Sequence, residues 1–333
     1  MICSLVRSGR ASLQSIGQDM DLEIDLESRV KKAKRWLKSK WTDAETHFIP
    51  YLIPIIRSLS KTNQIIIAID GSSIGDCMTL MISIIWRNRA IPVCWTVRKA
   101  PKGHFPEQMH VDLIKTAASI FESVLGKGHR IILLGDGEFD GVELMKTCRE
   151  VGWLFVVRTG KGCLISDNPE AEGAIRFDAV SPQYGQETFF MTDIRVTRQA
   201  YGHINALWWH EKKYEYPIFL LTNIDEAPFA MFCYKKRYCI ETFFSDIKSR
   251  GFNINRTKVV CPEMIFNLLI VAALAFILAI LAAFEGVQSE VLSKFIRKDR
   301  VKNFSVFQIG LRTLKFFFKK QHCFSFQFSN NFP

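Results

Sequence analysis

Four polar residues in the last third of the chain have the spacing that a metal and phosphate site on one helix would need: Tyr234, Arg237, Glu241 and Lys248. At about 100° per residue, they fall within about 60° of one another on an α-helix. Such a helix would offer one carboxylate to a metal, with two cations and a phenol beside it to meet a phosphate. The adjoining apolar stripe is predicted to pack on the core: Ile240, Phe243, Phe244 and Ile247. The alternative is a solvated helix with Arg237 and Glu241 as an i,i+4 ion pair.

Two aspartates elsewhere in the chain could complete a metal site, because metal-dependent phosphoryl transfer needs about three carboxylates. Asp70 follows the apolar run 65–69, and Asp136 follows the run 131–134 and one glycine. Both runs are short and aliphatic, which predicts buried strands. An aspartate at the end of a buried strand is costly unless it has a partner or binds a metal. Each alone could be a turn or cap residue, but two of them with a later glutamate favour a shared site.

The order Asp70, Asp136 and Glu241, with the Tyr-Arg-Glu-Lys signature, resembles the DDE transposases of bacterial insertion sequences, specifically the insertion sequence four family. The resemblance covers about residues 60 to 285. Members of the family often have Asp-x-Gly followed by an aromatic residue at the second acid. Here Gly137 and Glu138 take the two places before the aromatic residue, so the assignment of Asp136 depends partly on its strand context, and Asp140 is the alternative.

The resemblance implies an RNase H-like catalytic core that cuts and joins DNA ends with two divalent ions per site. In this interpretation Asp70 bridges both ions, and Asp136 and Glu241 each complete one coordination shell. Carboxylate and water ligands suit Mg²⁺, or Mn²⁺, better than zinc. Arg237 and Lys248 would contact phosphates and Tyr234 would orient the DNA end. The expected partners are the terminal inverted repeats of the element and target DNA.

The charge of the chain is consistent with a polyanionic partner. Its 333 residues carry a net charge of +11 and give a pI of about 9.2, which favours nucleic-acid binding. One basic cluster surrounds Trp36 and is a candidate DNA-binding surface: Lys31, Lys32, Lys34 and Arg35. A second basic cluster lies in the C-terminal region after residue 293. A solvated helix face is the alternative for each cluster.

The cysteines and the apolar segments bear on where the protein is found. The chain has nine cysteines and no C-x2-C pair, which indicates free thiols and a reducing cytoplasm, with the protein associated with the nucleoid. The segment 264–284 contains one polar residue, Asn267, and is long enough to span a bilayer. We expect it to be a buried helix rather than a membrane span, because it lacks basic flanks and the family has a similar apolar stretch.

The predicted fold class is α/β: an RNase H-like mixed sheet with flanking helices, a β-rich insertion, and helical N- and C-terminal regions. The first predicted part is a helical DNA-binding and dimerisation region, possibly truncated, over residues 1–60. The catalytic core follows in two pieces, 61–159 and 226–285, separated by the β-rich insertion over 160–225. A basic C-terminal region covers 286–333. A homodimer is the expected oligomer.

Two adjacent tryptophans lie in the β-rich insertion. In a strand, Trp208 and Trp209 would face opposite sides, so one is expected to pack inward and the other to project outward. The favoured interpretation is that both belong to the core. The alternative is that one of them is a platform for an extruded DNA base, which makes both candidate DNA-binding residues. Three other functions stay open from the sequence: an RNase H-like nuclease that does not join ends, an inactive DNA-binding remnant, and a membrane protein.

Overall fold

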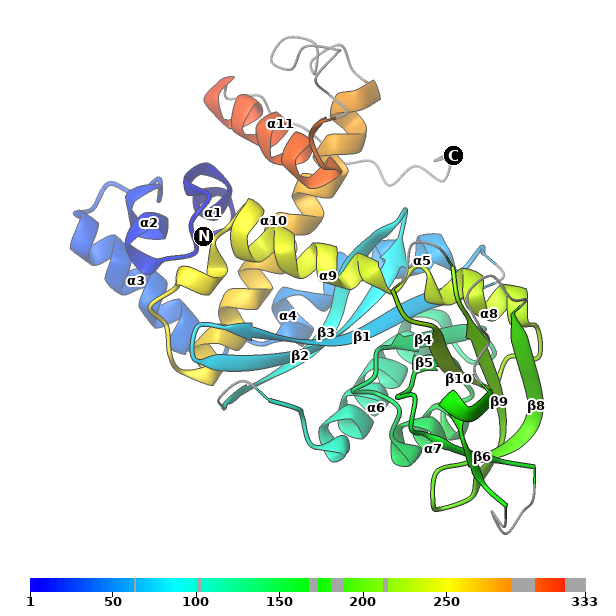
Figure 1. Ribbon diagram of the computed structural model, residues 1–333. Coiled ribbons are helices and arrows are strands. Elements are labelled where there is room, and N and C mark those ends of the chain that lie inside the picture. Colours follow the sequence, from blue (N-terminus) through cyan, green and yellow to red (C-terminus); the bar gives the residue numbers. More distant parts are fainter. Residues whose placement is uncertain are drawn as a thin grey trace.

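A ten-stranded mixed sheet runs through the protein, with strands in the order β3-β2-β1-β4-β5-β10-β9-β8-β6-β7 (Figure 1). The computed structural model describes residues 1–62, 64–100, 103–167, 173–180, 188–211, 215–288 and 303–320. Helices cover both faces of the sheet. Helices α6 and α7 lie on one face, and α8 and α9 lie on the other (Figure 1).

The first five strands form the half of the sheet that carries the predicted acids. Strands β1 (Ile65–Ile74), β2 (Cys77–Trp86) and β3 (Arg89–Lys99) are an antiparallel meander. Strands β4 (Ile131–Gly135) and β5 (Leu154–Arg158) run parallel to β1, linked through α6 (Glu107–Leu125) and α7 (Val142–Glu150). A helix in each crossover is the usual connection between parallel strands. The mixed α/β architecture is RNase H-like and confirms the predicted fold class.

The first strand extends further than the sequence predicted. Strand β1 continues past Asp70 to Ile74, because its second half pairs with β2 from Asp70↔Met81 to Ile74↔Cys77. Asp70 therefore lies within β1 rather than at its end. Gly75 turns the chain between β1 and β2 with a φ of 55°, a left-handed conformation that glycine adopts readily.

The β-rich segment adds its strands to the same sheet. Strand β10 (Ile218–Thr222) pairs with β5, followed outward by β9 (Tyr201–Trp209), β8 (Phe189–Val196), β6 (Leu164–Ser166) and β7 (Ile175–Arg176). A short 3₁₀ turn, Phe177–Val180, packs beside them. The segment between the second and third predicted acids is thus a continuation of the core sheet.

The expectation of an outward-facing tryptophan is wrong. Trp208 is 0% exposed and Trp209 is 2% exposed. Trp208 stacks on Phe189 with 4.4 Å between ring centroids, and Trp209 contacts Tyr234 edge-on at 6.3 Å. The two indoles do face opposite sides of β9, but both sides are covered. Phe177 in the 3₁₀ turn packs edge-on against Trp208 at 5.2 Å, and Tyr234 of α8 (Ala227–Tyr234) packs against Trp209. Neither indole is available as a platform for a DNA base in this conformation.

The predicted single helix over the Tyr-Arg-Glu-Lys residues is also wrong. Tyr234 ends α8, Arg237 precedes α9 (Tyr238–Ser245), and Lys248 lies in a π-helical turn over Asp246–Arg250. The break falls in the basic stretch between α8 and α9, where the chain makes a turn. The apolar stripe is confirmed, because its four side chains are at most 4% exposed.

The long apolar segment is the core of helix α10 (Pro262–Gln288), which packs against β3, α1 and α11 (Val306–Lys320). Its part Pro262–Phe284 is long and apolar enough to cross a membrane, but 83% of the most apolar window is buried within the protein. Helix α11 approaches α10 very closely, because a Cβ on Gly310 would lie 1.7 Å from the carbonyl oxygen of Ala279.

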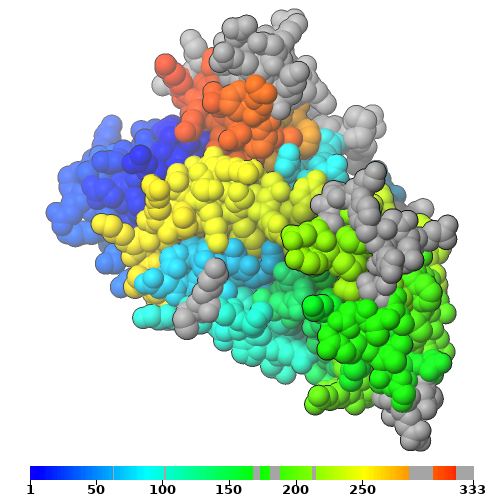
Figure 2. Space-filling model, viewed as in Figure 1, coloured from blue at the N-terminus to red at the C-terminus, as the bar shows by residue number. Residues whose placement is uncertain are grey.

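Five helices precede the sheet: α1 (Ile2–Ser8), α2 (Leu13–Gln18), α3 (Leu26–Lys38), α4 (Ala44–His47) and α5 (Ile49–Leu59). Helix α1 contacts both α10 and α11, so the N-terminal and C-terminal helices pack together on one side of the protein (Figure 1). In Figure 2 they flank the yellow band that contains α9 and the turn after it.

Candidate active site

The pairing of β1 with β4 brings the two predicted aspartates together. These strands are parallel, with Ala68 opposite Leu134. Asp70 and Asp136 each lie two residues beyond this pair, and the Asp136 carboxylate is close enough to repel that of Asp70. Asp70 is half-buried and accepts a hydrogen bond of 2.8 Å from the backbone N–H of Gly71. Asp136 accepts one of 3.0 Å from the backbone N–H of Glu138. Two carboxylates thus share one edge of the sheet.

Burial and the neighbouring carboxylate favour the protonated form of Asp70. Burial is the larger cause and repulsion from Asp136 the second, and together they raise the pKa of Asp70 to about 7, against the attraction of Arg237. A cation bound between the two carboxylates would neutralise their repulsion and so favour the ionised form of Asp70. The pair has the electrostatic character of a cation site.

Glu241 in α9 and Arg237 just before α9 bring a third acid and a cation to the two aspartates. They form an ion pair, in which the Glu241 side chain is 54% exposed and the Arg237 side chain is 16% exposed. Arg237 also interacts electrostatically with Asp70. The Nη1 atom of Arg237 is buried and has no hydrogen-bond partner within the described part of the chain. One guanidinium therefore links Glu241 to Asp70.

The other two signature residues lie on either side of the acids. Tyr234 is 8% exposed, and burial raises the pKa of its phenol, partly offset by Arg237. Lys248 donates a hydrogen bond of 2.7 Å from Nζ to Oγ of Ser72, two residues beyond Asp70 on the same face of β1. The π-helical turn after α9 thus places Lys248 against the strand that carries the first aspartate.

The donor set fits a divalent cation only in part. Among the residues that the structure describes, no three acidic, histidine or cysteine side chains are gathered closely enough to bind one ion. Asp70, whose pKa is raised, and the adjacent Asp136 have the oxygen ligands that Mg²⁺ and Mn²⁺ prefer. Glu241 could join them only by turning away from Arg237, which holds it here.

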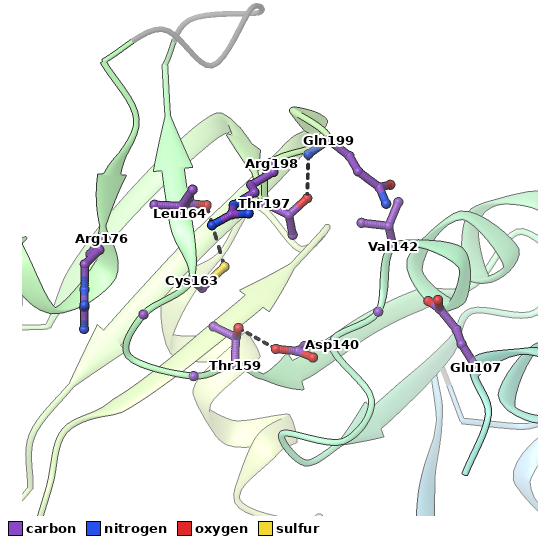
Figure 3. A pocket seen from close by; sticks show the side chains of 13 residues that line it. Glu107, Asp140, Val142, Thr159, Cys163, Leu164, Arg176, Thr197, Arg198 and Gln199 are labelled. Carbon is purple, nitrogen blue, oxygen red and sulfur yellow. Dashed lines mark hydrogen bonds between the residues drawn. The ribbon is translucent and has the colours of Figure 1, made fainter. Parts of the chain in front are cut away.

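The alternative second acid, Asp140, faces a different part of the molecule. It accepts a hydrogen bond of 2.7 Å from Thr159, and burial raises its pKa. It lines a hollow of about 820 Å³ between the start of α7 and the loops of the β-rich segment, with Cys163 and Arg198 on the other wall (Figure 3). This hollow is not lined by Asp70, Asp136 or Glu241. The geometry therefore favours Asp136 over Asp140 as the neighbour of Asp70.

The N-terminal basic cluster lies on the solvent side of α3. Four of its side chains are exposed, while Ala33 and Leu37 on the opposite side are buried: Lys31, Lys32, Lys34 and Arg35. Lys31 pairs with Glu27. Much of the second cluster, from Lys294 to Lys302, lies outside the described residues.

Sequence reasoning gave no role to three residues of this region: Ser72 and Glu138, which lie next to the aspartates, and the buried Asp246. Ser72 could have been found from strand alternation, because it is two residues from Asp70. Glu138 stands out in the sequence only as a departure from the family pattern. Its hydrogen bond to the backbone of Phe105 joins it to a loop 33 residues earlier in the chain, which no local pattern indicates. Asp246, in the π-helical turn, is 0% exposed, and neither carboxyl oxygen has a hydrogen-bond partner in the part of the chain described here. Burial raises the pKa of Asp246 to about 6. Its charged neighbours Arg89 and Arg250 lower this pKa and so partly offset the burial.

The raised pKa of Asp70 predicts a stability effect that is separate from catalysis. Its pKa rises from an ordinary 3.8 to about 7 on folding, so the metal-free protein loses stability as pH increases through that interval. Asp70→Asn stays neutral, and we expect it to melt at a higher temperature than wild type at pH 8. The difference should shrink at pH 5 and vanish below about pH 4. Equal melting temperatures at pH 8 would mean that Asp70 ionises normally.

Comparison with known protein families gives a match over most of the chain. The family model described as "Transposase DDE domain" matches residues 62–278, from just before β1 into α10. This range includes the two aspartates, the glutamate and the β-rich segment between them. No curated protein sequence matches the chain.

Proposed function

Because the chain belongs to the transposases with a DDE domain, we propose that it cuts DNA at the ends of an insertion sequence and joins them to target DNA. The observation that carries this proposal is the placement of Asp70 beside Asp136, with Arg237 between them and Glu241. This grouping joins strands β1 and β4 with the segment at α9. DNA is the partner that the family implies, and enzymes of the family generally use divalent metals.

We assign a metal-binding role to each of the three acids. Asp70 would bind both ions, with Asp136 completing one site and Glu241 the other after release from Arg237. Two bound Mg²⁺ or Mn²⁺ ions would activate the attacking oxygen and stabilise the leaving oxygen. Arg237, once Glu241 has turned to the metal, would offer its guanidinium to the DNA phosphate. These roles are consistent with the Tyr-Arg-Glu-Lys spacing of the insertion sequence four family, to which we assign the chain.

The DNA is proposed to contact two further parts of the protein. Lys248 would give up its hydrogen bond to Ser72 and bind a phosphate of the DNA. Tyr234 would hold the side chain of Arg237 in position. The exposed basic side of α3 would bind the duplex further from the acids, as part of an N-terminal DNA-binding and dimerisation region. We propose that the protein acts as a homodimer on the terminal repeats, in the cytoplasm with the nucleoid. Trp208 and Trp209 are left out of the proposed DNA contacts because both are buried.

One experiment separates the proposed activity from the alternatives. Full-length protein is incubated with a labelled duplex that carries the end of the element, plus a supercoiled target plasmid, with Mg²⁺, Mn²⁺ or EDTA. A transposase cuts the duplex and transfers label to the plasmid only when metal is present. Cutting without transfer would indicate a nuclease, and DNA binding without cutting would indicate an inactive remnant.

Loss of either signature cation should change how DNA binding depends on salt. We expect Arg237→Ala and Lys248→Ala each to lower the slope of log affinity against log salt by about 0.9, because each contact with a phosphate releases about one counterion. The measurement is fluorescence anisotropy of a labelled duplex over a series of salt concentrations. Lys115→Ala, an exposed position on α6, is the control and should leave the slope unchanged. An unchanged slope for both variants would mean that neither side chain contacts a phosphate, and that Arg237 only forms an ion pair with Glu241 on the protein surface.

A further inference from the structure

We propose that Glu138 is a positioning residue that, together with Glu107, fixes the loop carrying Asp136 against Asp70. The inference rests on the proposed metal-dependent function, since it concerns the spacing of two proposed metal ligands. Glu138 lies in the segment where this chain departs from the family pattern, and the proposed mechanism gives it no role.

Glu138 connects the second aspartate to a loop before α6. Its Oε1 accepts a hydrogen bond of 2.6 Å from the backbone N–H of Phe105. Its own backbone N–H donates to Oδ1 of Asp136 at 3.0 Å. The side chain is 19% exposed, and no lysine or arginine within the described residues forms an ion pair with it. His104 and His110 are nearby, with ring nitrogens 3.6 and 4.0 Å from its carboxylate. The carboxylate thus acts mainly as an acceptor for backbone N–H.

Glu107 makes the reciprocal contact. Its Oε1 accepts hydrogen bonds from the backbone N–H groups of Glu143 at 2.9 Å and Leu144 at 3.4 Å, in the first turn of α7. These N–H groups have no partner within the helix, and an acidic side chain there is favourable. Figure 3 shows Glu107 beside the segment that contains Asp140 and Val142. The start of α6 and the loop from β4 to α7 therefore each supply a glutamate to the other's backbone.

The loop before α6 that contains Phe105 packs closely against β1, next to the first aspartate. A Cβ on Gly71 would lie 2.9 Å from the ring of Phe105 and 3.8 Å from Oε2 of Glu138. Phe105 is 5% exposed, with the guanidinium of Arg98 over its ring at 5.1 Å. Gly71 follows Asp70 and donates its backbone N–H to that carboxylate. Glu138 thus holds Phe105, which packs against Gly71 beside Asp70, and it also bonds to Asp136 through its backbone N–H. Its removal would loosen the distance between the two aspartates.

The test measures metal binding directly, with Mn²⁺ as the probe and full-length protein without DNA. Bound Mn²⁺ is obtained from the paramagnetic resonance signal of the free ion, and melting temperature is recorded in parallel. We expect Glu138→Ala to weaken Mn²⁺ binding by about 10- to 100-fold, as loss of residues that orient metal ligands does. Glu138→Gln keeps an oxygen acceptor for Phe105 and should restore most of the affinity. Glu143→Ala removes a nearby carboxylate but keeps the capped backbone N–H, and should bind as wild type does.

The possible outcomes separate this inference from the proposed function. Wild-type affinity in Glu138→Ala would overturn the positioning role. Equal losses in the Gln and Ala variants would also overturn it, since the charge of Glu138 would then matter and the residue would be a metal ligand. If Glu138→Ala does not fold, Gly71→Ala tests the same contact, and its unchanged Mn²⁺ affinity would contradict the inference. Failure of wild type both to bind Mn²⁺ and to cut DNA would instead reject the proposed function.

Discussion

Asp70→Asn, Asp136→Asn and Glu241→Gln are each expected to reduce metal-dependent DNA cleavage by at least about a thousandfold, because each removes a charged oxygen ligand and keeps the side-chain shape. A loss of several kcal/mol in transition-state stabilisation is the usual effect of removing metal-assisted catalysis, and about 1.4 kcal/mol corresponds to tenfold in rate. DNA binding should survive in all three variants, since Arg237, Lys248 and the α3 surface remain. The measurement is cleavage and strand transfer of a labelled duplex with Mg²⁺ or Mn²⁺.

Asp140→Asn is the matched control for the second acid. Its carboxyl group bonds to Thr159 and lines the hollow beside α7, so the variant should cut at a rate near that of wild type. If Asp140→Asn is inactive and Asp136→Asn cuts normally, the second acid is Asp140. If all three amide variants keep wild-type activity, this group of carboxylates does not catalyse the reaction.

Ala275→Asp is expected to have the largest effect on stability. Ala275 is 0% exposed in the middle of α10, a helix surrounded by β3, α1, α3 and α11. A carboxylate there would have no water and no partner, so we expect a loss of about 4 kcal/mol or more and an unfolded or insoluble protein. The measurement is urea unfolding followed by circular dichroism, or the soluble fraction if the variant cannot be purified.

Leu278→Asp is the control for Ala275→Asp, because Leu278 is half-buried on the same helix. Its carboxylate can reach water, so the loss of stability should be clearly smaller. Equal tolerance of both substitutions would contradict a buried α10. Recovery of the wild-type protein only with detergent would indicate that α10 lies in a membrane.

Local sequence patterns predicted the elements on which the proposed site depends. The aliphatic runs before Asp70 and Asp136 became β1 and β4, because such runs gain free energy only when both faces of a strand are buried. The stripe from Ile240 to Ile247 is buried, because its spacing matches a helix that packs on a sheet. The apolar segment 264–284 lies within a buried helix. In each case the information is contained within a few neighbouring residues.

The relative positions of these elements were decided only by the tertiary structure. Asp70 and Asp136 lie side by side because β1 and β4 pair in parallel, and no local pattern specifies that register. The signature residues predicted a single helix, but the structure has α8, α9 and a π-helical turn there, and the π-helical turn brings Lys248 to Ser72. Trp208 and Trp209 alternate as predicted, yet both are buried because distant segments cover both faces of β9. The contacts of Glu138 with Phe105 and of Glu107 with α7 likewise join loops far apart in the chain. The sequence therefore determined which residues could do the chemistry, and long-range pairing and packing determined how they meet.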